Sequence, residues 1–222
     1  MVTDMAASPP APSAFPMRAG CRNATPPVRL AAAVLAALLA GCTTGGGTTT
    51  ASPPAPRPTS APPAVDPGPV ESPPIPPGAF AATVVRVVDG DTLLAVLPGT
   101  SRSLRIRLIG IDAPETVRPA TPVACYGPQA SALAHRLLSG ARVRAAYEPG
   151  GRADRFGREL WDVWLPDGRF LQAVLVTAGA ARAYPYRPQV RYAGPLRRLA
   201  DAAQTAHRGL WGPPCHGRSF GR

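Results

Sequence analysis

The sequence predicts a β-rich α+β domain: a five-stranded antiparallel barrel of the OB type, accompanied by three helices. Three observations support this fold class. Short segments of alternating or β-branched apolar residues end in turn residues such as Asp, Gly and Pro. Three of these segments follow one another directly, which favours a meander that curls into a small barrel. Segments with helical apolar spacing come only after the third strand.

Five segments are expected to be strands, and their sequences also predict where they end. Asp89-Gly90-Asp91 has the composition of a hairpin turn between the first two strands. Pro114 cannot extend a central strand, so the third strand should stop by Ala113. The five expected strands are 82–88, 92–97, 104–111, 141–147 and 159–165.

Three segments are expected to be helices, at 127–140, 170–178 and 194–207. Pro128 suits the first turn of a helix, where its missing N–H costs nothing. Glycines at 140 and 179 follow the first two apolar stripes and should end them.

The N-terminal 42 residues predict an export signal. Three arginines precede the apolar run 30–40, which is too short to span a bilayer. The run ends in Leu39-Ala40-Gly41-Cys42, which is similar to the lipobox of bacterial lipoproteins. We therefore expect an exported protein, tethered to the outer face of the cell membrane through lipidated Cys42 or released in a secreted form. A plain signal peptide with a chance cysteine is the alternative, and Met17 is an alternative start that would exclude residues 1–16.

Residues 43–78 are expected to be a disordered spacer, because they contain Gly, Thr, Ser, Ala and Pro with almost no large apolar residues. The folded domain is then expected at 79–222. That domain carries 20 arginines against 10 acidic residues, a net charge of +10. A basic domain suits polyanions such as nucleic acid or an anionic membrane. Solubility alone is the simpler explanation.

Four carboxylates cluster at two predicted turns. Asp89 and Asp91 lie in the first hairpin, and Asp112 and Glu115 follow the third strand. Alone, each pair could be an ordinary turn or helix cap. Together they offer hard oxygen ligands that suit Ca²⁺ or Mg²⁺ rather than zinc. With Arg107 nearby, they could supply a metal ligand, a base for water and a cation, which phosphodiester hydrolysis requires.

Two further segments predict contacts with a polynucleotide. Arg155 and Arg158 precede the fifth strand, and arginine binds phosphate oxygens through a planar fork of donors. Tyr184 and Tyr186 offer aromatic faces on which bases can stack. A solvated basic loop and structural tyrosines are the alternatives.

The cysteines and histidines show no paired spacing typical of a zinc site. Cys21 belongs to the expected signal and Cys42 to its end. Cys125 and Cys215 remain as an even pair in an exported domain, so we expect a disulfide between them, with two free thiols as the alternative.

Taken together, the motifs resemble the staphylococcal nuclease family in order and spacing over about residues 80–215. The matching segments are 87–92, 105–116, 125–131, 154–158, 184–186 and 209–211. The resemblance implies a monomeric OB-fold nuclease that uses Ca²⁺ to cut DNA and RNA, preferably single-stranded or unpaired, and leaves 3′-phosphates.

The resemblance also implies a role for each matching residue. Arg107, Glu115 and Arg158 match catalytic positions, with Glu115 as the general base. Asp91, Asp112 and the backbone carbonyl of Ala113 match calcium ligands, with Asp89 close to the metal. Arg155, Tyr184 and Tyr186 match substrate contacts.

Three departures from the family pattern affect these expectations. Ala113 replaces a Thr that contributes only its carbonyl, Phe156 replaces a Tyr whose hydroxyl contacts the terminal phosphate, and the loop 117–124 differs throughout. The alternative function is a non-catalytic OB module that binds nucleic acid, because degenerate family members lose the acids or arginines. All of them are present here. An envelope lipoprotein with a basic, polymer-binding face is a third possibility that would not need them.

Overall fold

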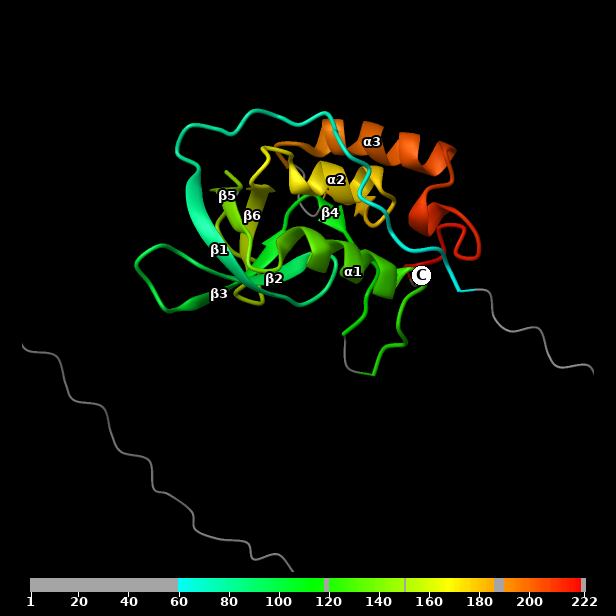
Figure 1. The fold of residues 1–222 in the computed structure, drawn as a ribbon, viewed down its shortest axis with the longest axis horizontal. Helices are drawn as coiled ribbons and strands as arrows, with labels where there is room; N and C mark the ends of the chain where they lie inside the picture. Colours follow the sequence, from blue (N-terminus) through cyan, green and yellow to red (C-terminus); the bar gives the residue numbers. More distant parts are fainter. Residues whose placement is uncertain (1–59, 118–119, 150, 186–189, 221–222) are drawn as a thin grey trace, which may run out of the picture. The chain divides into compact units, whose positions relative to one another are not determined.

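Five strands close a barrel in the computed structural model, which describes residues 60–117, 120–149, 151–185 and 190–220 (Figure 1). Around the barrel the order is β1-β2-β3-β6-β5. The strands are β1 (Phe80–Val87), β2 (Thr92–Val96), β3 (Ser103–Leu108), β5 (Arg142–Tyr147) and β6 (Glu159–Trp164). The predicted five-stranded barrel is therefore confirmed.

The prediction of a wholly antiparallel barrel is wrong at one seam. β3 and β6 pair in parallel, with Ile106 opposite Glu159 and Leu108 opposite Trp161, whereas the other neighbours are antiparallel. β6 lies far from β3 in the sequence, after a helix and another strand, so no short turn fixes its direction. Alternation within each strand predicts which side chains are inside but not which way the strand runs.

The barrel interior is filled by apolar side chains at alternating positions. Val84, Leu93, Ile106 and Val163 are each at most 1% exposed. Burying each such side chain stabilises the fold by roughly 1.5–3 kcal/mol. A shift of one residue in the strand pairing would expose these side chains, so their burial fixes the strand register.

The three predicted helices are present, and they cover one side of the barrel (Figure 1). They are α1 (Gly127–Leu138), α2 (Leu171–Thr177) and α3 (Ala193–Thr205), followed by the 3₁₀ turn η1 (Gly209–Trp211). α2 is buried along nearly its whole length, and α3 packs against it as an outer layer. None of the helices that the structure describes is long and apolar enough to cross a membrane.

The third strand is shorter than expected, because the chain turns at Gly110. Gly110 has a φ of +81°, and a Cβ there would lie 2.8 Å from Leu196 Cδ1 of α3. A side chain here would be strained by the left-handed backbone conformation and would require Leu196 to shift. After this turn, β4 (Ile111–Asp112) pairs with β7 (Arg182–Ala183) in a separate two-stranded sheet. The turn thus moves Asp112 off the barrel.

Residues 60–78 are not the free spacer that their composition predicts, and the expected domain boundary at residue 79 is too late. This segment runs from beside the C-terminal residues back to the start of β1 (Figure 1). The carbonyl of Pro73 accepts a hydrogen bond from Trp164 Nε1 at 2.9 Å, and the Ser72 hydroxyl accepts one from Phe170 N at 2.9 Å. Asp66 forms an ion pair with Arg169. We call residues 60–78 the N-terminal strap.

The strap is held mainly by polar contacts. This explains why the near absence of large apolar residues led to the prediction of a disordered spacer. Apart from Ala64, which is 1% exposed, it places few apolar side chains in the core. Arg136 donates to the carbonyl of Ala64, and Arg169 donates to that of Gly68 at 3.0 Å. The expected signal, Cys42 and residues 43–59 lie outside the described residues.

Candidate active site

One cavity of about 420 Å³ opens beside the Asp89–Asp91 turn, at the junction of the barrel and the β4–β7 sheet. It gathers side chains from the first hairpin, the end of β3, the loop before β6 and the end of β7. All of the described residues predicted for chemistry or substrate binding line it: Asp89, Asp91, Arg107, Asp112, Ala113, Glu115, Arg155, Arg158 and Tyr184. Tyr186 lies outside the described residues.

Asp89 builds the turn that presents Asp91. Its Oδ1 accepts hydrogen bonds from the backbone N–H groups of Asp91 at 3.0 Å and Thr92 at 2.8 Å. Gly90 lets this turn approach the next loop, since a Cβ there would lie 2.6 Å from the Cβ of Ala113. Asp89 therefore has a structural task in addition to its negative charge.

Asp91 is buried and held from two sides. Its Oδ2 accepts a 2.7 Å hydrogen bond from Ala113 N, and its Oδ1 accepts one from the Thr92 hydroxyl at 3.1 Å. Burial raises the pKa of Asp91 to about 6; the Arg107 charge opposes this shift and the Asp89 charge adds to it. The carboxylate is thus kept in a position where a nearby cation favours its charged form.

Arg107 joins the two carboxylates predicted to hold a metal. Its Nη2 lies 3.1 Å from Asp91 Oδ2 and 3.2 Å from Asp112 Oδ1, while Nη1 donates to the carbonyl of Leu108 at 2.7 Å. Burial raises the pKa of Asp112, and the neighbouring Asp91 charge raises it further. Two like charges are held close together, an arrangement that is stabilised only when a cation lies between them.

These residues fit a divalent cation with oxygen ligands. Asp91 and Asp112 converge on one cationic nitrogen, and Ala113, whose carbonyl the resemblance implicates, lies against Asp91. Among the described residues no group of three His, Cys, Asp or Glu side chains is arranged to hold a metal. Two carboxylates completed by a backbone carbonyl and water are compatible with Ca²⁺, which accepts such mixed oxygen shells.

Arg158 is positioned by Asp154, a residue that the sequence analysis did not single out. Asp154 Oδ2 accepts a 2.7 Å hydrogen bond from Arg158 Nε, and its Oδ1 accepts bonds from the backbone N–H groups of Phe156 and Arg158. Burial alone would raise the pKa of Asp154, but these hydrogen bonds outweigh it and lower the pKa. The loop therefore folds around one ionised carboxylate and directs Arg158 to the cavity.

Glu115 lies in the same cavity, on the loop after β4. Its Oε1 accepts hydrogen bonds from the backbone N–H groups of Thr116 and Val117, both at 3.0 Å. The side chain is thus folded back over its own loop, which limits its rotamers and fixes where the carboxylate lies. A fixed carboxylate is what a general base for a positioned water needs.

Comparison with known proteins shows the family to which this chain belongs. A family model described as "Staphylococcal nuclease homologue" matches residues 105–213. A thermonuclease from Staphylococcus hyicus is 40% identical over 128 residues, which are 58% of this chain and 73% of the relative. The chain belongs to the staphylococcal nuclease family. A thermonuclease from Staphylococcus intermedius is likewise 40% identical over 128 residues, covering 58% and 74%. The endonuclease YncB of Bacillus subtilis (strain 168) is 32% identical over 130 residues, covering 58% and 60%.

Two positions that depart from the pattern of the staphylococcal nuclease family line the cavity. Ala113 is fixed by the bond from its N–H to Asp91, so the change from Thr leaves the backbone in place. Phe156 is 65% exposed, with the guanidinium of Arg155 4.8 Å and that of Arg158 5.6 Å from its ring centre. Phe156 has no hydroxyl with which to donate a hydrogen bond, but its largely exposed ring lies beside two guanidinium groups.

Arg182 is a cavity residue that the sequence analysis missed. It lies opposite Asp112 in the β4–β7 pair, and its Nε and Nη2 donate to Asp112 Oδ2 at 3.1 and 2.8 Å. Seventy residues separate the two in sequence. Only the pairing of two very short strands brings them together, and no local pattern predicts such a pairing.

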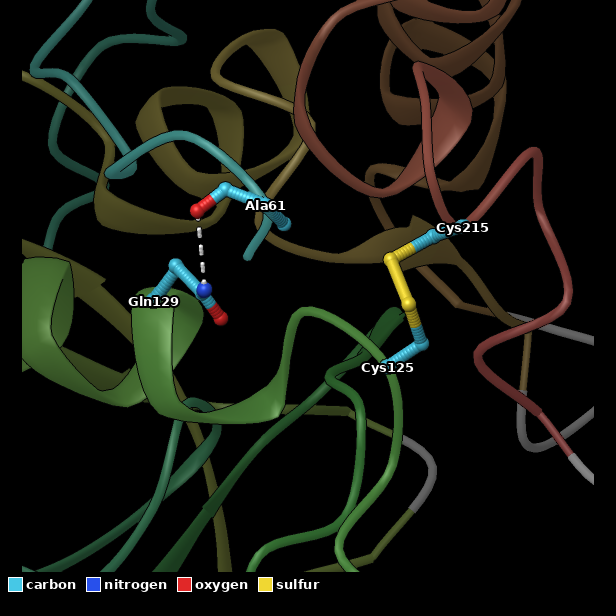
Figure 2. Close-up of a disulfide and its surroundings, with 4 residues drawn as sticks. All are labelled: Ala61, Cys125, Gln129 and Cys215. Carbon is cyan, nitrogen blue, oxygen red and sulfur yellow. Dashed lines mark hydrogen bonds between the residues drawn. A yellow bond between two sulfur atoms is a disulfide. The ribbon is translucent and has the colours of Figure 1, made fainter. Parts of the chain in front are cut away.

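A disulfide joins Cys125 to Cys215, with Cα atoms 5.7 Å apart (Figure 2). It connects the residues just before α1 to the C-terminal segment. On the first turn of α1, Gln129 Nε2 also donates to the carbonyl of Ala61 in the N-terminal strap at 3.1 Å (Figure 2). The start of α1 is therefore a point where both ends of the described chain are attached.

Proposed function

We propose that this protein is a calcium-dependent phosphodiester hydrolase that cleaves DNA and RNA and leaves 3′-phosphates. The observation that carries the proposal is the single cavity shared by Asp91, Asp112, Glu115, Arg107 and Arg158. Family membership supports the same activity, since its relatives include thermonucleases and an endonuclease. A non-catalytic binding module would have no need of a fixed carboxylate in the same cavity as these two arginines.

Each residue has a defined task in the proposed reaction. Asp91, Asp112 and the carbonyl of Ala113 would hold Ca²⁺, which when bound polarises the phosphate and an attacking water. Glu115 accepts the proton of that water. Arg107 and Arg158 stabilise the negative charge that grows on the phosphate oxygens as the oxygen of the attacking water becomes the fifth oxygen bonded to phosphorus. The bond to the 5′ oxygen then breaks, and solvent is the proposed source of its proton, because arginine retains its own protons at neutral pH.

We further propose that single-stranded or unpaired substrate is preferred. Phe156 and Tyr184 are exposed rings at the cavity, and Arg155 lies beside Phe156. Bases stack on such rings at roughly 1–3 kcal/mol each, which requires that the base be released from a duplex. Tyr186 would extend this stacking surface.

The decisive experiment is cleavage of end-labelled single-stranded DNA and RNA by the purified full chain, with Ca²⁺ or with EGTA. We expect cleavage only with Ca²⁺, with a phosphate on the new 3′ end and a hydroxyl on the new 5′ end at each cut. Glu115→Gln should lower turnover by orders of magnitude while binding of the uncut strand persists, because the shape of the side chain is kept and its basicity is lost. Absence of cleavage by the wild-type protein with Ca²⁺ present would refute the enzyme proposal.

We also propose that the protein is exported and anchored to the outer face of the cell membrane through lipidated Cys42, and that it acts as a monomer. The proposal rests on the sequence Leu39-Ala40-Gly41-Cys42 after a short apolar run. Metabolic labelling with a fatty acid should mark the wild-type protein and not Cys42→Ser. Equal labelling of the two proteins would exclude Cys42 as the attachment site.

A further inference from the structure

We propose that the C-terminal segment, residues 215–220, is a positioning element of the active site. In this proposal, which rests on the proposed nuclease function, Phe220 holds Arg182 and Arg182 holds Asp112. The Cys125–Cys215 disulfide keeps the segment in place. Residues outside the predicted catalytic set would thereby determine the geometry of a carboxylate inside it.

The first of these contacts is the pair of hydrogen bonds that Arg182 donates to Asp112. Two donors of one guanidinium meet a single oxygen, Oδ2, while Arg107 holds Oδ1 on the other side at 3.2 Å. With each oxygen held by a different arginine, the carboxylate cannot rotate without breaking a charge-assisted hydrogen bond. Arg182 therefore sets the orientation in which Oδ1 faces Arg107.

The second contact is the ring of Phe220 against the guanidinium of Arg182. Its centre lies 3.8 Å from Arg182 Cζ, within the range of a close cation–π contact, and the Tyr184 ring lies 5.0 Å away. Two aromatic rings thus restrict a side chain that is still 34% exposed. Without Phe220, Arg182 would keep its charge and lose its closest aromatic neighbour.

The third contact fixes the segment itself. Cys215 is 1% exposed and tied to Cys125, and Gly217 N donates to the carbonyl of Leu210 at 2.8 Å. Ser219 is 4% exposed, so the chain just before Phe220 is packed rather than loose. Because the disulfide lies only five residues before Phe220, it limits how far that ring can move from Arg182.

The test compares Phe220→Leu with Phe220→Tyr in the full-length protein. Leucine keeps an apolar side chain but has no ring, whereas tyrosine keeps the ring. We expect Phe220→Leu to lower kcat on single-stranded DNA about fivefold, the factor that corresponds to a contact of about 1 kcal/mol. Phe220→Tyr should stay close to wild type, and the melting temperatures of both should be close to that of wild type.

Arg182→Lys tests the next contact, because lysine keeps the charge and loses the two-donor fork. We expect a loss of kcat at least as large as that of Phe220→Leu, and a several-fold weaker affinity for Ca²⁺ by calorimetry in both variants. If the two residues act through one path, the double variant should lose no more than Arg182→Lys alone.

Removal of the disulfide by Cys125→Ala with Cys215→Ala should give the same loss as Phe220→Leu, with no further loss when the changes are combined. Wild-type turnover and Ca²⁺ affinity in Phe220→Leu, or losses that multiply in the combined variants, would overturn the proposal. A wild-type protein that cuts nothing would instead refute the nuclease function, and the calorimetric comparison would still decide whether Arg182 orients Asp112.

Discussion

Replacing Asp162 with Asn should remove a large pH-dependent weakness from the barrel. Asp162 lies on β6 opposite Ala146 and is 1% exposed. Its Oδ2 has no hydrogen-bond partner in the part of the chain that the structure describes. Burial raises the pKa of Asp162 to about 8, the Glu148 charge adds to this shift, and the Arg191 charge opposes it.

The sign of the effect follows from where the proton is held. Between about pH 4 and 8 the folded protein keeps a proton on Asp162 that the unfolded chain releases, so unfolding becomes more favourable as pH rises. A shift of about four pK units, at about 1.4 kcal/mol per unit, corresponds to a full loss of about 6 kcal/mol, of which about 5 kcal/mol is reached at pH 8, where the folded carboxyl is half ionised. Asn has the same shape and no charge, and should not suffer this loss.

Urea denaturation at pH 4 to 8 measures the difference directly. The free energies of unfolding of wild type and Asp162→Asn should coincide near pH 4 and separate by about 5 kcal/mol in favour of the variant at pH 8. Asp201→Asn, the same change at an exposed position on α3, should follow wild type throughout. If the free energies of unfolding of wild type and Asp162→Asn changed in parallel with pH, the buried carboxyl would not be the cause of a loss of stability.

Two further perturbations test the strap and the substrate face. A chain that starts at residue 79 should be at least about 3 kcal/mol less stable to urea than one that starts at 60, because the hydrogen bonds from Gln129, Trp164 and Phe170 contribute about 1 kcal/mol each. The contacts of Arg136 and Arg169 with the strap are lost as well; equal stabilities would contradict a structural strap. In a Glu115→Gln background, Arg155→Ala should weaken single-stranded DNA binding and reduce its salt slope by about 0.7. Arg142→Ala, an exposed arginine on β5 outside the cavity, should leave the slope unchanged, and equal slopes for both variants would exclude a phosphate contact by Arg155.

Local chemistry explains what could be predicted from the sequence. Short apolar segments predicted the five barrel strands, and turn residues placed Asp89 and Asp91 at a hairpin, because both depend on neighbours within a few residues. The staphylococcal nuclease resemblance, carried by six separate motifs, is confirmed by the family match.

Long-range pairing explains what could not be predicted. The parallel seam between β3 and β6 and the approach of Arg182 to Asp112 both join segments that are far apart in the chain. Gly110 also lies close to Leu196, on a helix more than 80 residues later. Such contacts form only in the assembled fold, and the neighbouring residues in the sequence do not indicate them.

The N-terminal strap also determines how far the proposed anchor can extend. A spacer of residues 43–78 would have allowed 36 residues between a lipid on Cys42 and the folded domain, a reach of roughly 120 Å when fully extended. Because the domain includes residues from 60 onward, 17 residues remain, which reach at most about 60 Å. An anchored protein of this kind would work within a shell close to the lipid surface, and polynucleotides that come near the cell would be its accessible substrates.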